Sequence, residues 1–355
     1  MMDYTPKISA VQLFIALTVS RVFLCFTNMP QNALLSSTET IIAIAISSVL
    51  NFMLFLPFIY ISRKIEEKQI TNNKLLSAVI VIFCVFLVVE TLTQFENFMS
   101  STIYLTSSPI FFLIPMIVVA IFICKLGLEG IARLSGFVLA GIIVAIIMIF
   151  IAAFPKMDAV WIDVFLVENY KNLIDVIFKN LCYTTEIAVL FILFPFSKGN
   201  IKKCALLFSV LVGVIVESIT ILNITALGDY RKSIMFPFYT VAATAKNSMT
   251  DRFNAAYIVL FVFVAMIRIC IYLFASQKAL RKIFYFENNT IVLVLLSVFI
   301  FAFSLVSTSE ISSISLAQKI IFSGIPTILI SIVFPFLLFV LNLIKRRRIN
   351  EKDRS

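Results

Sequence analysis

Glu186 is the residue of this 355-residue chain whose type and position most directly suggest chemistry. It lies in an apolar stretch over residues 178–203, directly after the hydroxyl-bearing residues Tyr183, Thr184 and Thr185. An ionised carboxylate in hydrocarbon costs roughly 2.5 kcal/mol or more, so such a residue normally faces a cavity, a partner or a ligand. We therefore predict a ligand-binding site in which Glu186 receives a cationic group and the three hydroxyls add hydrogen bonds. The alternative is a structural charge that is paired within the protein.

Arg21 occupies a matching position near the N-terminus. It precedes Pro30 by nine residues, as Glu186 precedes Pro195 by nine. Secondary transporters built from inverted repeats bind their substrates where interrupted helices meet. We expect Arg21 to neutralise Glu186, because leaving either charge alone in a low-dielectric interior is costly. The alternative is that Arg21, together with Cys25 one turn further on, binds the carboxylate of a zwitterionic ligand, which would split the ion pair and shift the protein between two states.

Other charged residues lie within or beside apolar stretches. Glu217 and Arg268 are candidates for a buried pair, and for both of them and for Glu90 we favour a structural ion-pair role over a ligand, proton or water pathway, which stays open. Asp251 and Arg252 precede an apolar stretch, and Asp251 suits the positive end of a helix. The alternative for Asp251 and Arg252 is an outer gate or a contact with a partner subunit.

Composition defines the class of protein. Hydrophobic residues make up 61% of the chain, charged residues 14%, and the mean hydropathy is +1.06, which indicates an integral membrane protein. We therefore attribute the net charge of +10 to basic loop residues that orient the protein in the membrane, and not to nucleic-acid binding. The chain has no histidine, and its six cysteines occur singly, as small core residues do. We expect no metal, no cofactor and no enzymatic activity.

Ten apolar stretches approach the roughly 20 residues that a helix needs to cross a bilayer. Most basic residues of the short loops fall on one side, which predicts that both termini are cytoplasmic. We predict an all-α integral membrane protein with one polytopic domain (1–355), a five-plus-five inverted repeat (about 8–154 and 178–344), interrupted helices one and six, and a basic tail (345–355) near anionic lipid. The predicted spans are 8–30, 41–62, 75–97, 109–124, 133–154, 178–197, 203–227, 255–276, 290–307 and 321–344.

Two long loops lie between these stretches. Residues 155–177 contain the only tryptophan and mix acidic with apolar residues, as an amphipathic helix at the membrane interface does. The loop 228–254 includes FPFYTVAATAKN, a candidate short helix that would cap a vestibule.

The five-plus-five division resembles the amino acid, polyamine and organocation transporter superfamily. Local motifs are similar to those of one branch, the B subunits of bacterial spore germinant receptors. They are KISAVQLFIAL, TNMP, GLEGIAR, TTEIAVLFILFPF and MTDRFNAAYIVLFVF, in this order along the chain. The chain departs from that family in having no glycine in its first span, where a break is usual, and in having Asn254 where an acidic residue is common.

This resemblance implies a protein of the spore inner membrane that acts with A- and C-type receptor subunits. Such a protein senses a small nutrient germinant, typically an amino acid, and triggers germination. The alternative is a secondary amino-acid transporter coupled to H⁺ or Na⁺, and a channel for ions or water is a third possibility.

Overall fold

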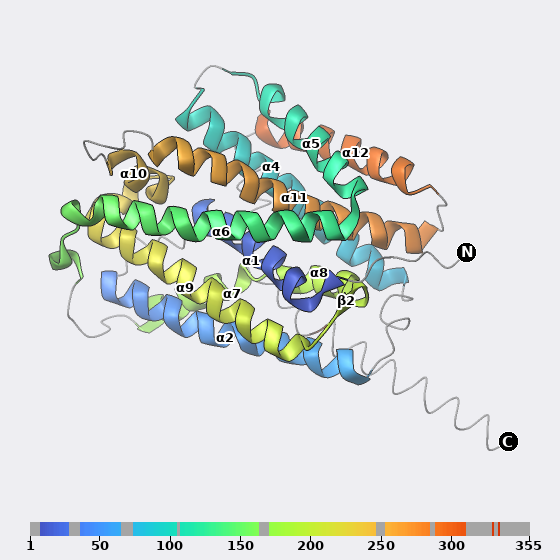
Figure 1. The fold of residues 1–355 in the computed structure, drawn as a ribbon, viewed down its shortest axis with the longest axis horizontal. Helices are drawn as coiled ribbons and strands as arrows, with labels where there is room; N and C mark the ends of the chain where they lie inside the picture. Colours follow the sequence, from blue (N-terminus) through green and yellow to red (C-terminus); the bar gives the residue numbers. More distant parts are fainter. Residues whose placement is uncertain are drawn as a thin grey trace.

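The computed structural model describes residues 8–27, 36–64, 74–104, 107–162, 170–245, 253–284 and 288–309, together with positions 329 and 333. These ranges are helical apart from turns and one pair of two-residue strands (Figure 1). The α-helices are α1 (Ala10–Thr27), α2 (Ser37–Lys64), α4 (Lys74–Thr102), α5 (Ile110–Lys125), α6 (Gly127–Ala153), α7 (Tyr170–Cys182), α8 (Glu186–Leu193), α9 (Ile201–Leu227), α10 (Pro237–Thr244), α11 (Phe253–Phe284) and α12 (Asn289–Ser309). The 3₁₀ turns are η1 (Phe154–Lys156), η2 (Ala159–Trp161), η3 (Phe194–Phe196) and η4 (Gly228–Ser233).

The described part of the chain contains eight helical segments that are long and apolar enough to cross a membrane, and α5 is a shorter apolar helix. Each predicted stretch up to residue 307 is helical over most of its described residues. The tenth stretch, 321–344, lies outside the described residues apart from positions 329 and 333, and so does the tail 345–355. The chain is therefore an all-α membrane protein, as its composition predicts.

The first and sixth spans differ, which corrects one expectation. Helix α1 is continuous from Ala10 to Thr27, so the predicted interruption of the first span is wrong over this range. Its sequence contains neither glycine nor proline, the residues that most readily interrupt a helix. The sixth span is interrupted as expected, because α7 ends at Cys182 and α8 begins at Glu186.

The predictions for the two long loops, 155–177 and 228–254, agree with the structure to different extents. Instead of one interfacial helix over 155–177, the described residues form the short turns η1 and η2, and the helix that begins at Tyr170 is the first half of the sixth span. The short helix predicted in FPFYTVAATAKN is confirmed as α10, which begins with Pro237 at its first position, where a missing N–H is tolerated.

Helix α1 is the centre of the packing. All its residues from Ala16 to Thr27 are buried, and it packs against α6, α9 and α11. The most extensive helix contacts join α4 to α11 and α2 to α9, and Figure 1 shows these two pairs on opposite sides of α1. From Ala16 to Thr27, side chains of α1 therefore face other parts of the protein on all sides.

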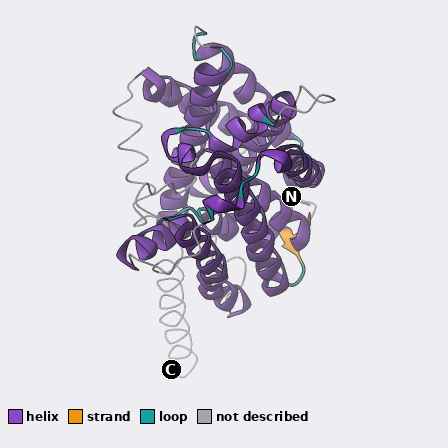
Figure 2. Cartoon of the chain, turned by 90° about the vertical axis from the view of Figure 1, so that its left-hand side faces the viewer, coloured by secondary structure: helices purple, strands orange, loops and turns teal. Residues whose placement is uncertain are grey.

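A parallel pair of two-residue strands joins the two lead spans. Strand β1 (Ile8–Ser9) precedes α1, and β2 (Ser197–Lys198) follows η3. Ile8 pairs with Ser197 and Ser9 with Lys198, at the edge of the helical bundle (Figure 2). This ladder fixes the start of the first span against the end of the sixth.

Candidate ligand-binding site

The break in the sixth span is formed by Tyr183, Thr184 and Thr185. Irregular bonds replace the helical pattern here, with Thr184 N donating to Leu181 O at 3.0 Å and Thr185 N to Tyr183 O at 2.9 Å. Thr184 and Thr185 are both buried. Non-helical backbone at membrane depth is tolerated only where it is enclosed by protein or lines a cavity. The break is therefore built into the interior of the protein.

Side chains of two other helices hold this break in place. Thr184 Oγ1 donates to Asn51 Oδ1 of α2 at 2.8 Å, and Thr185 Oγ1 lies 2.7 Å from Tyr272 OH of α11. All these groups are buried, so loss of either bond would leave a polar atom without a partner. The threonine hydroxyls predicted to serve a ligand thus contact the protein itself.

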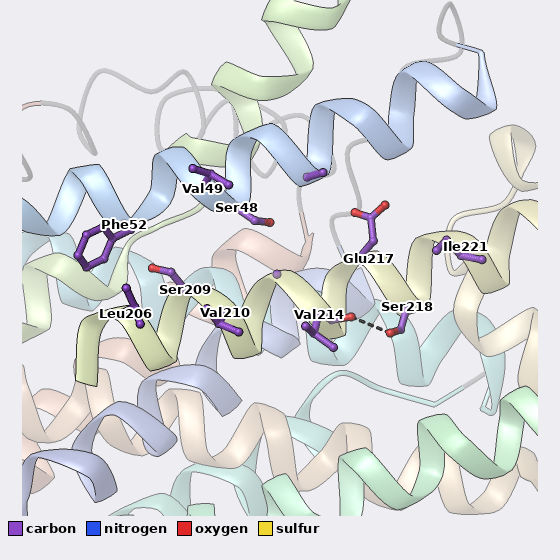
Figure 3. Close-up of a pocket in the computed structure, with 12 residues that line it drawn as sticks. Ser48, Val49, Phe52, Leu206, Ser209, Val210, Val214, Glu217, Ser218 and Ile221 are labelled. Carbon is purple, nitrogen blue, oxygen red and sulfur yellow. Dashed lines mark hydrogen bonds between the residues drawn. The ribbon is translucent and has the colours of Figure 1, made fainter. Parts of the chain in front are cut away.

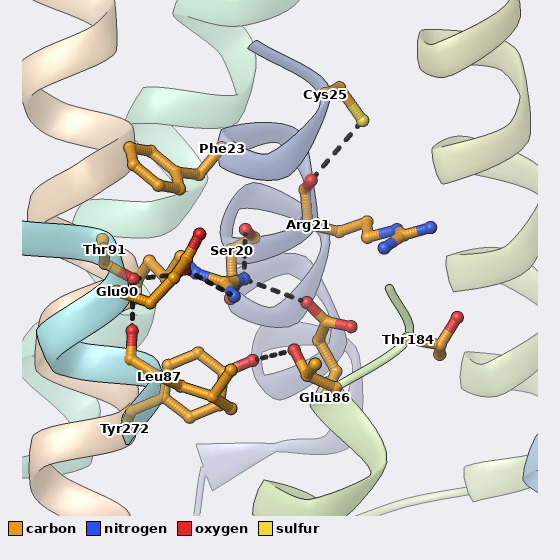
Figure 4. A network of polar contacts seen from close by, with 12 residues as sticks. Ser20, Arg21, Phe23, Cys25, Leu87, Glu90, Thr91, Thr184, Glu186 and Tyr272 are labelled. Atoms are coloured by element: carbon orange, nitrogen blue, oxygen red, sulfur yellow. Dashed lines mark hydrogen bonds and ion pairs between the residues drawn. The ribbon is translucent and has the colours of Figure 1, made fainter. Parts of the chain in front are cut away.

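Arg268 of α11 is completely buried and bonds to a polar network; Figure 4 shows Ser20, Glu90, Thr91 and Glu186 of this network. Its Nε donates to Thr91 Oγ1 at 3.0 Å, and its Nη1 donates to the carbonyl oxygen of Ser20 at 3.0 Å and to Ser20 Oγ at 3.2 Å. Two carboxylates complete the network: Glu186 Oε1 lies 3.5 Å from Nη1, and Glu90 Oε2 lies 4.0 Å from Nη2. The guanidinium thereby connects α1, α4 and α8 to α11.

This geometry corrects two predicted pairings. The partner of Glu186 is Arg268 and not Arg21, and the partners of Arg268 are Glu186 and Glu90 and not Glu217. The physical reason is that Arg268 reaches Glu186 from α11, whereas Arg21 Nη2 is bonded to Asn180 of α7; in Figure 4 the Arg21 side chain points away from Glu90 and Thr91. The prediction that Glu90 and Arg268 belong to a buried charge network agrees with this arrangement.

Arg21 is buried in a second polar cluster. Its Nη2 donates to the carbonyl oxygen of Asn180 at 2.8 Å and to Asn180 Oδ1 at 2.9 Å, at the end of α7. Asn180 Nδ2 donates in turn to Ser47 Oγ of α2. The guanidinium also lies 5.6 Å from the ring centroid of Tyr183, and Cys25 Sγ lies 3.5 Å from the carbonyl oxygen of Arg21. Arg21 and Tyr183 therefore lie on the α7 side of the break, and Cys25 lies one turn further along α1.

Polar atoms without hydrogen bonds occur on both sides of the break. In the described part of the chain, Arg21 Nε and Nη1 have no hydrogen-bond partner although they are buried. Glu186 Oε2, on the α8 side, is likewise buried and has none. Buried polar groups in proteins are normally satisfied, so these three atoms are exceptions that call for an explanation.

The remaining predicted residues lie elsewhere. Glu217 of α9 faces a groove beside α2, and Asp251 and Arg252 lie outside the described residues. No group of three or more His, Cys, Asp or Glu side chains that could hold a metal ion occurs among the residues that the structure describes.

Sequence reasoning missed six residues that complete these clusters. They are Ser20, Ser47, Asn51, Thr91, Asn180 and Tyr272. Asn51 and Asn180 are amides within apolar stretches, and this signal could have identified them, because a polar residue in a membrane span usually has a specific partner. Serine and threonine give a weaker signal, because their hydroxyls can bond the carbonyl one turn earlier.

Comparison with known families identifies the chain. A family described as "Spore germination protein" matches residues 62–312. The chain belongs to the spore germination protein family. This membership confirms the resemblance that the sequence motifs indicated, and it makes the chain a transporter-like, non-enzymatic membrane protein of germination.

Solved structures show the same architecture. A Na⁺-coupled sialic acid symporter in a substrate-bound, outward-open state is similar, with a TM-score of 0.59 and 13% identity over 94% of this chain and 78% of the symporter chain. This spore germination protein therefore has a LeuT-like transporter fold. A comparison with curated proteins returns no match.

Proposed function

We propose that this chain is the germinant-sensing subunit of a spore germination receptor. It binds a small zwitterion, an amino acid, at the break between α7 and α8 and signals to A- and C-type subunits in the spore inner membrane, with both of its termini on the cytoplasmic side. The observation that carries the proposal is the set of buried, unsatisfied atoms of Arg21 and Glu186 on the two sides of the break.

The chemistry of Arg21 and Glu186 indicates which charged group of the ligand each side chain would bind. Arg21 retains unbonded N–H donors on Nε and Nη1 beside its positive charge, and such charged donors suit a carboxylate. Glu186 retains Oε2 as an acceptor for an ammonium group, while its Oε1 faces Arg268. Tyr183 and Cys25 lie beside Arg21 and would contact the ligand there.

Binding of such a ligand would favour one conformation of the break. A ligand shifts an equilibrium only through its different affinity for the two states. An amino acid that bridges Arg21 and Glu186 would stabilise the state in which these groups face each other across the break. This role replaces the expectation that the ligand splits an Arg21–Glu186 pair, because Glu186 is already paired with Arg268.

The repeat organisation belongs to the same proposal. The strongest helix contacts join the second span (α2) to the seventh (α9) and the third (α4) to the eighth (α11). Two five-helix repeats related by symmetry would place equivalent spans against each other in this way. This pairing supports a five-plus-five repeat around the binding site.

Arg268 argues against the alternative of sodium-coupled transport. A sodium site needs inward-facing oxygen ligands. Here the carbonyl and hydroxyl oxygens of Ser20 and the hydroxyl of Thr91 already accept hydrogen bonds from a guanidinium. This fixed cation balances the carboxylates that a bound metal ion would otherwise neutralise.

The proposal is tested by substituting Arg21 in the purified, detergent-solubilised chain. Ligand-induced thermal shifts are measured with each proteinogenic L-amino acid for the wild type and for Arg21→Met and Arg21→Lys. At least one amino acid should stabilise the wild type, Arg21→Met should lose the shift, and Arg21→Lys should retain a reduced shift because it keeps the charge without the planar guanidinium donors.

Arg133→Met is the matched control, because Arg133 is exposed and pairs only with the neighbouring Glu129 among the described residues. It should keep the wild-type shift, and spores carrying it should keep the wild-type germination dose response. An undiminished response in Arg21→Met would refute the assigned role of Arg21.

A further inference from the structure

A groove on the outer face of the helical body lies between α2 and α9 (Figure 3). It has a volume of about 560 Å³, and its walls are mostly apolar. Several lining residues are exposed at its surface, among them Val49 of α2 and Val210 and Val214 of α9. In a membrane protein, this face meets either lipid or another protein.

Two polar groups in the groove have no hydrogen-bond partner in the described part of the chain. Glu217 projects from α9 beside α2, and its Oε2 is buried without a partner (Figure 3). Ser209, 5% exposed, also has an unbonded Oγ. Other serines of the groove behave differently, because Ser48 Oγ donates to Ile44 O and Ser218 Oγ to Val214 O. Ser209 therefore differs from the other two serines, because its buried hydroxyl donates to no carbonyl of its own helix.

The depth of Glu217 makes lipid an unsuitable neighbour. Helix α9 extends over Ile201–Leu227, so Glu217 lies well inside the span and far from either end. A carboxylate facing hydrocarbon at such a depth costs roughly 2.5 kcal/mol or more. Acyl chains carry no donor that would offset this cost.

We infer that the α2–α9 groove receives a transmembrane helix of a companion receptor subunit, whose basic or amide side chain donates a hydrogen bond to Glu217. This inference rests on the proposed function, which supplies the companion subunits. Ser209 and Glu217 lie about 12 Å apart along the helix axis, which is roughly two turns. The partner helix therefore presents a second polar or small residue about two turns from its donor, opposite Ser209.

Charge complementarity selects this occupant over a second copy of the chain. A symmetric dimer through the groove would place the same surface of both copies together, and the two Glu217 carboxylates would approach each other. Like charges in a membrane interior repel strongly. A basic or amide donor on a different helix removes the cost and forms a hydrogen bond.

The inference is tested by co-expressing this chain with tagged A- and C-type subunits and measuring their co-purification. Glu217→Ala should reduce recovery of the companion subunits roughly tenfold, and Ser209→Ala roughly threefold, as expected for lost interhelical hydrogen bonds. Glu129→Ala and Ser307→Ala are matched controls: Glu129 is a surface acid, and Ser307 Oγ already donates to Phe303 O. Both controls should leave recovery unchanged.

A cross-linking measurement identifies the occupant. A photoreactive group is attached to Val214→Cys in the groove and, as a control, to Val144→Cys on α6; both positions are exposed, and the six native cysteines are buried. The Val214 probe should cross-link to an A- or C-type subunit, and the Val144 probe should not. Cross-links only to lipid, to a second copy or within the chain itself would overturn the inference, as would full recovery with Glu217→Ala.

Failure of this inference is distinguishable from failure of the proposed function. Glu217→Ala should keep the amino-acid thermal shift of the isolated chain, because Glu217 lies outside the Arg21 and Glu186 clusters. If Glu217→Ala detaches the companion subunits while no amino acid shifts the wild type, the docking site stands and the ligand site fails. If the thermal shift is normal and the subunits stay attached, the docking site fails alone.

Discussion

Arg268 Nη1 lies 3.5 Å from Glu186 Oε1, and both side chains are completely buried although they are 82 residues apart in the sequence. The same guanidinium also contacts Ser20 and Glu90, so one side chain joins four helices. A buried ion pair does not by itself stabilise a protein, but removing one partner leaves an uncompensated charge. We therefore expect removal of one charged partner to destabilise the protein far more than the intact pair stabilises it.

Substitution of Arg268 should strongly destabilise the protein. Arg268→Met leaves Glu186 and Glu90 without their cation, and we expect a loss of about 3–5 kcal/mol in the free energy of unfolding. The measurement is denaturant unfolding of the purified chain in detergent. Adding Glu186→Gln should recover part of the loss, because one of the two carboxylates is then neutral.

Arg133→Met serves again as the control here. Its exposed pair with Glu129 should contribute at most about 1 kcal/mol. Equal stability of Arg133→Met and Arg268→Met would show that the buried network does not hold the helices together.

Thr184→Val should loosen the break in the sixth span. The variant has nearly the same shape but leaves Asn51 Oδ1 without its donor, which should cost about 1–3 kcal/mol of unfolding free energy. Thr220→Val is the matched control, because the hydroxyl of Thr220 is buried and donates only to Val216 O in its own helix. A smaller effect at Thr184 than at Thr220 would contradict the role given to the Asn51 bond.

Germination through this protein should not require sodium. Arg268 supplies a fixed cation at the centre, so replacing Na⁺ by K⁺ at constant ionic strength should leave the germinant concentration for half-maximal response unchanged. Holding the ionic strength constant keeps the screening of surface charges the same. A response that disappears without Na⁺ would favour a sodium-coupled mechanism.

Gly228→Ala should disturb the only tryptophan of the chain. Gly228 has φ +56°, and an added Cβ would lie 2.6 Å from two atoms of the Trp161 ring. We expect a loss of more than about 1 kcal/mol in unfolding free energy and a change in Trp161 fluorescence.

Gly136→Ala is the control for this position, because it is helical and no atom lies within 4 Å of its added Cβ. Alanine there should stabilise α6 by up to about 1 kcal/mol without changing the fluorescence. An unchanged spectrum in Gly228→Ala would contradict the close contact with Trp161.

The sequence predicted the helices and the burial of key charges, but not their partners. Apolar stretches predicted the spans up to residue 307 because a bilayer imposes a minimum length on each helix. Glu186 and Arg21 were predicted to lie in the interior, and both do. Their partners were predicted incorrectly, because pairing depends on how each helix is rotated about its axis. Helix α1 is apolar on all sides, so its sequence contains no stripe that reveals this rotation.

The break shows the same limit at the scale of single bonds. Tyr183, Thr184 and Thr185 were recognised as polar residues in an apolar span and were assigned to a ligand. The structure pairs Thr184 with Asn51 and Thr185 with Tyr272, on helices that are distant in the sequence, and the ligand role of both threonines stays a prediction. Hydrogen bonds between such distant segments follow from the tertiary fold and are not encoded in local spacing.

The strand ladder between Ile8–Ser9 and Ser197–Lys198 restricts how the first and sixth spans can move relative to each other. It fastens α1, which carries Arg21, to the segment that follows α8, which carries Glu186. While the ladder is intact, these two elements can separate only at their opposite ends, so a solute bound as proposed between Arg21 and Glu186 would exchange with one side of the membrane. Such a site would report the solute concentration on that side without carrying solute across.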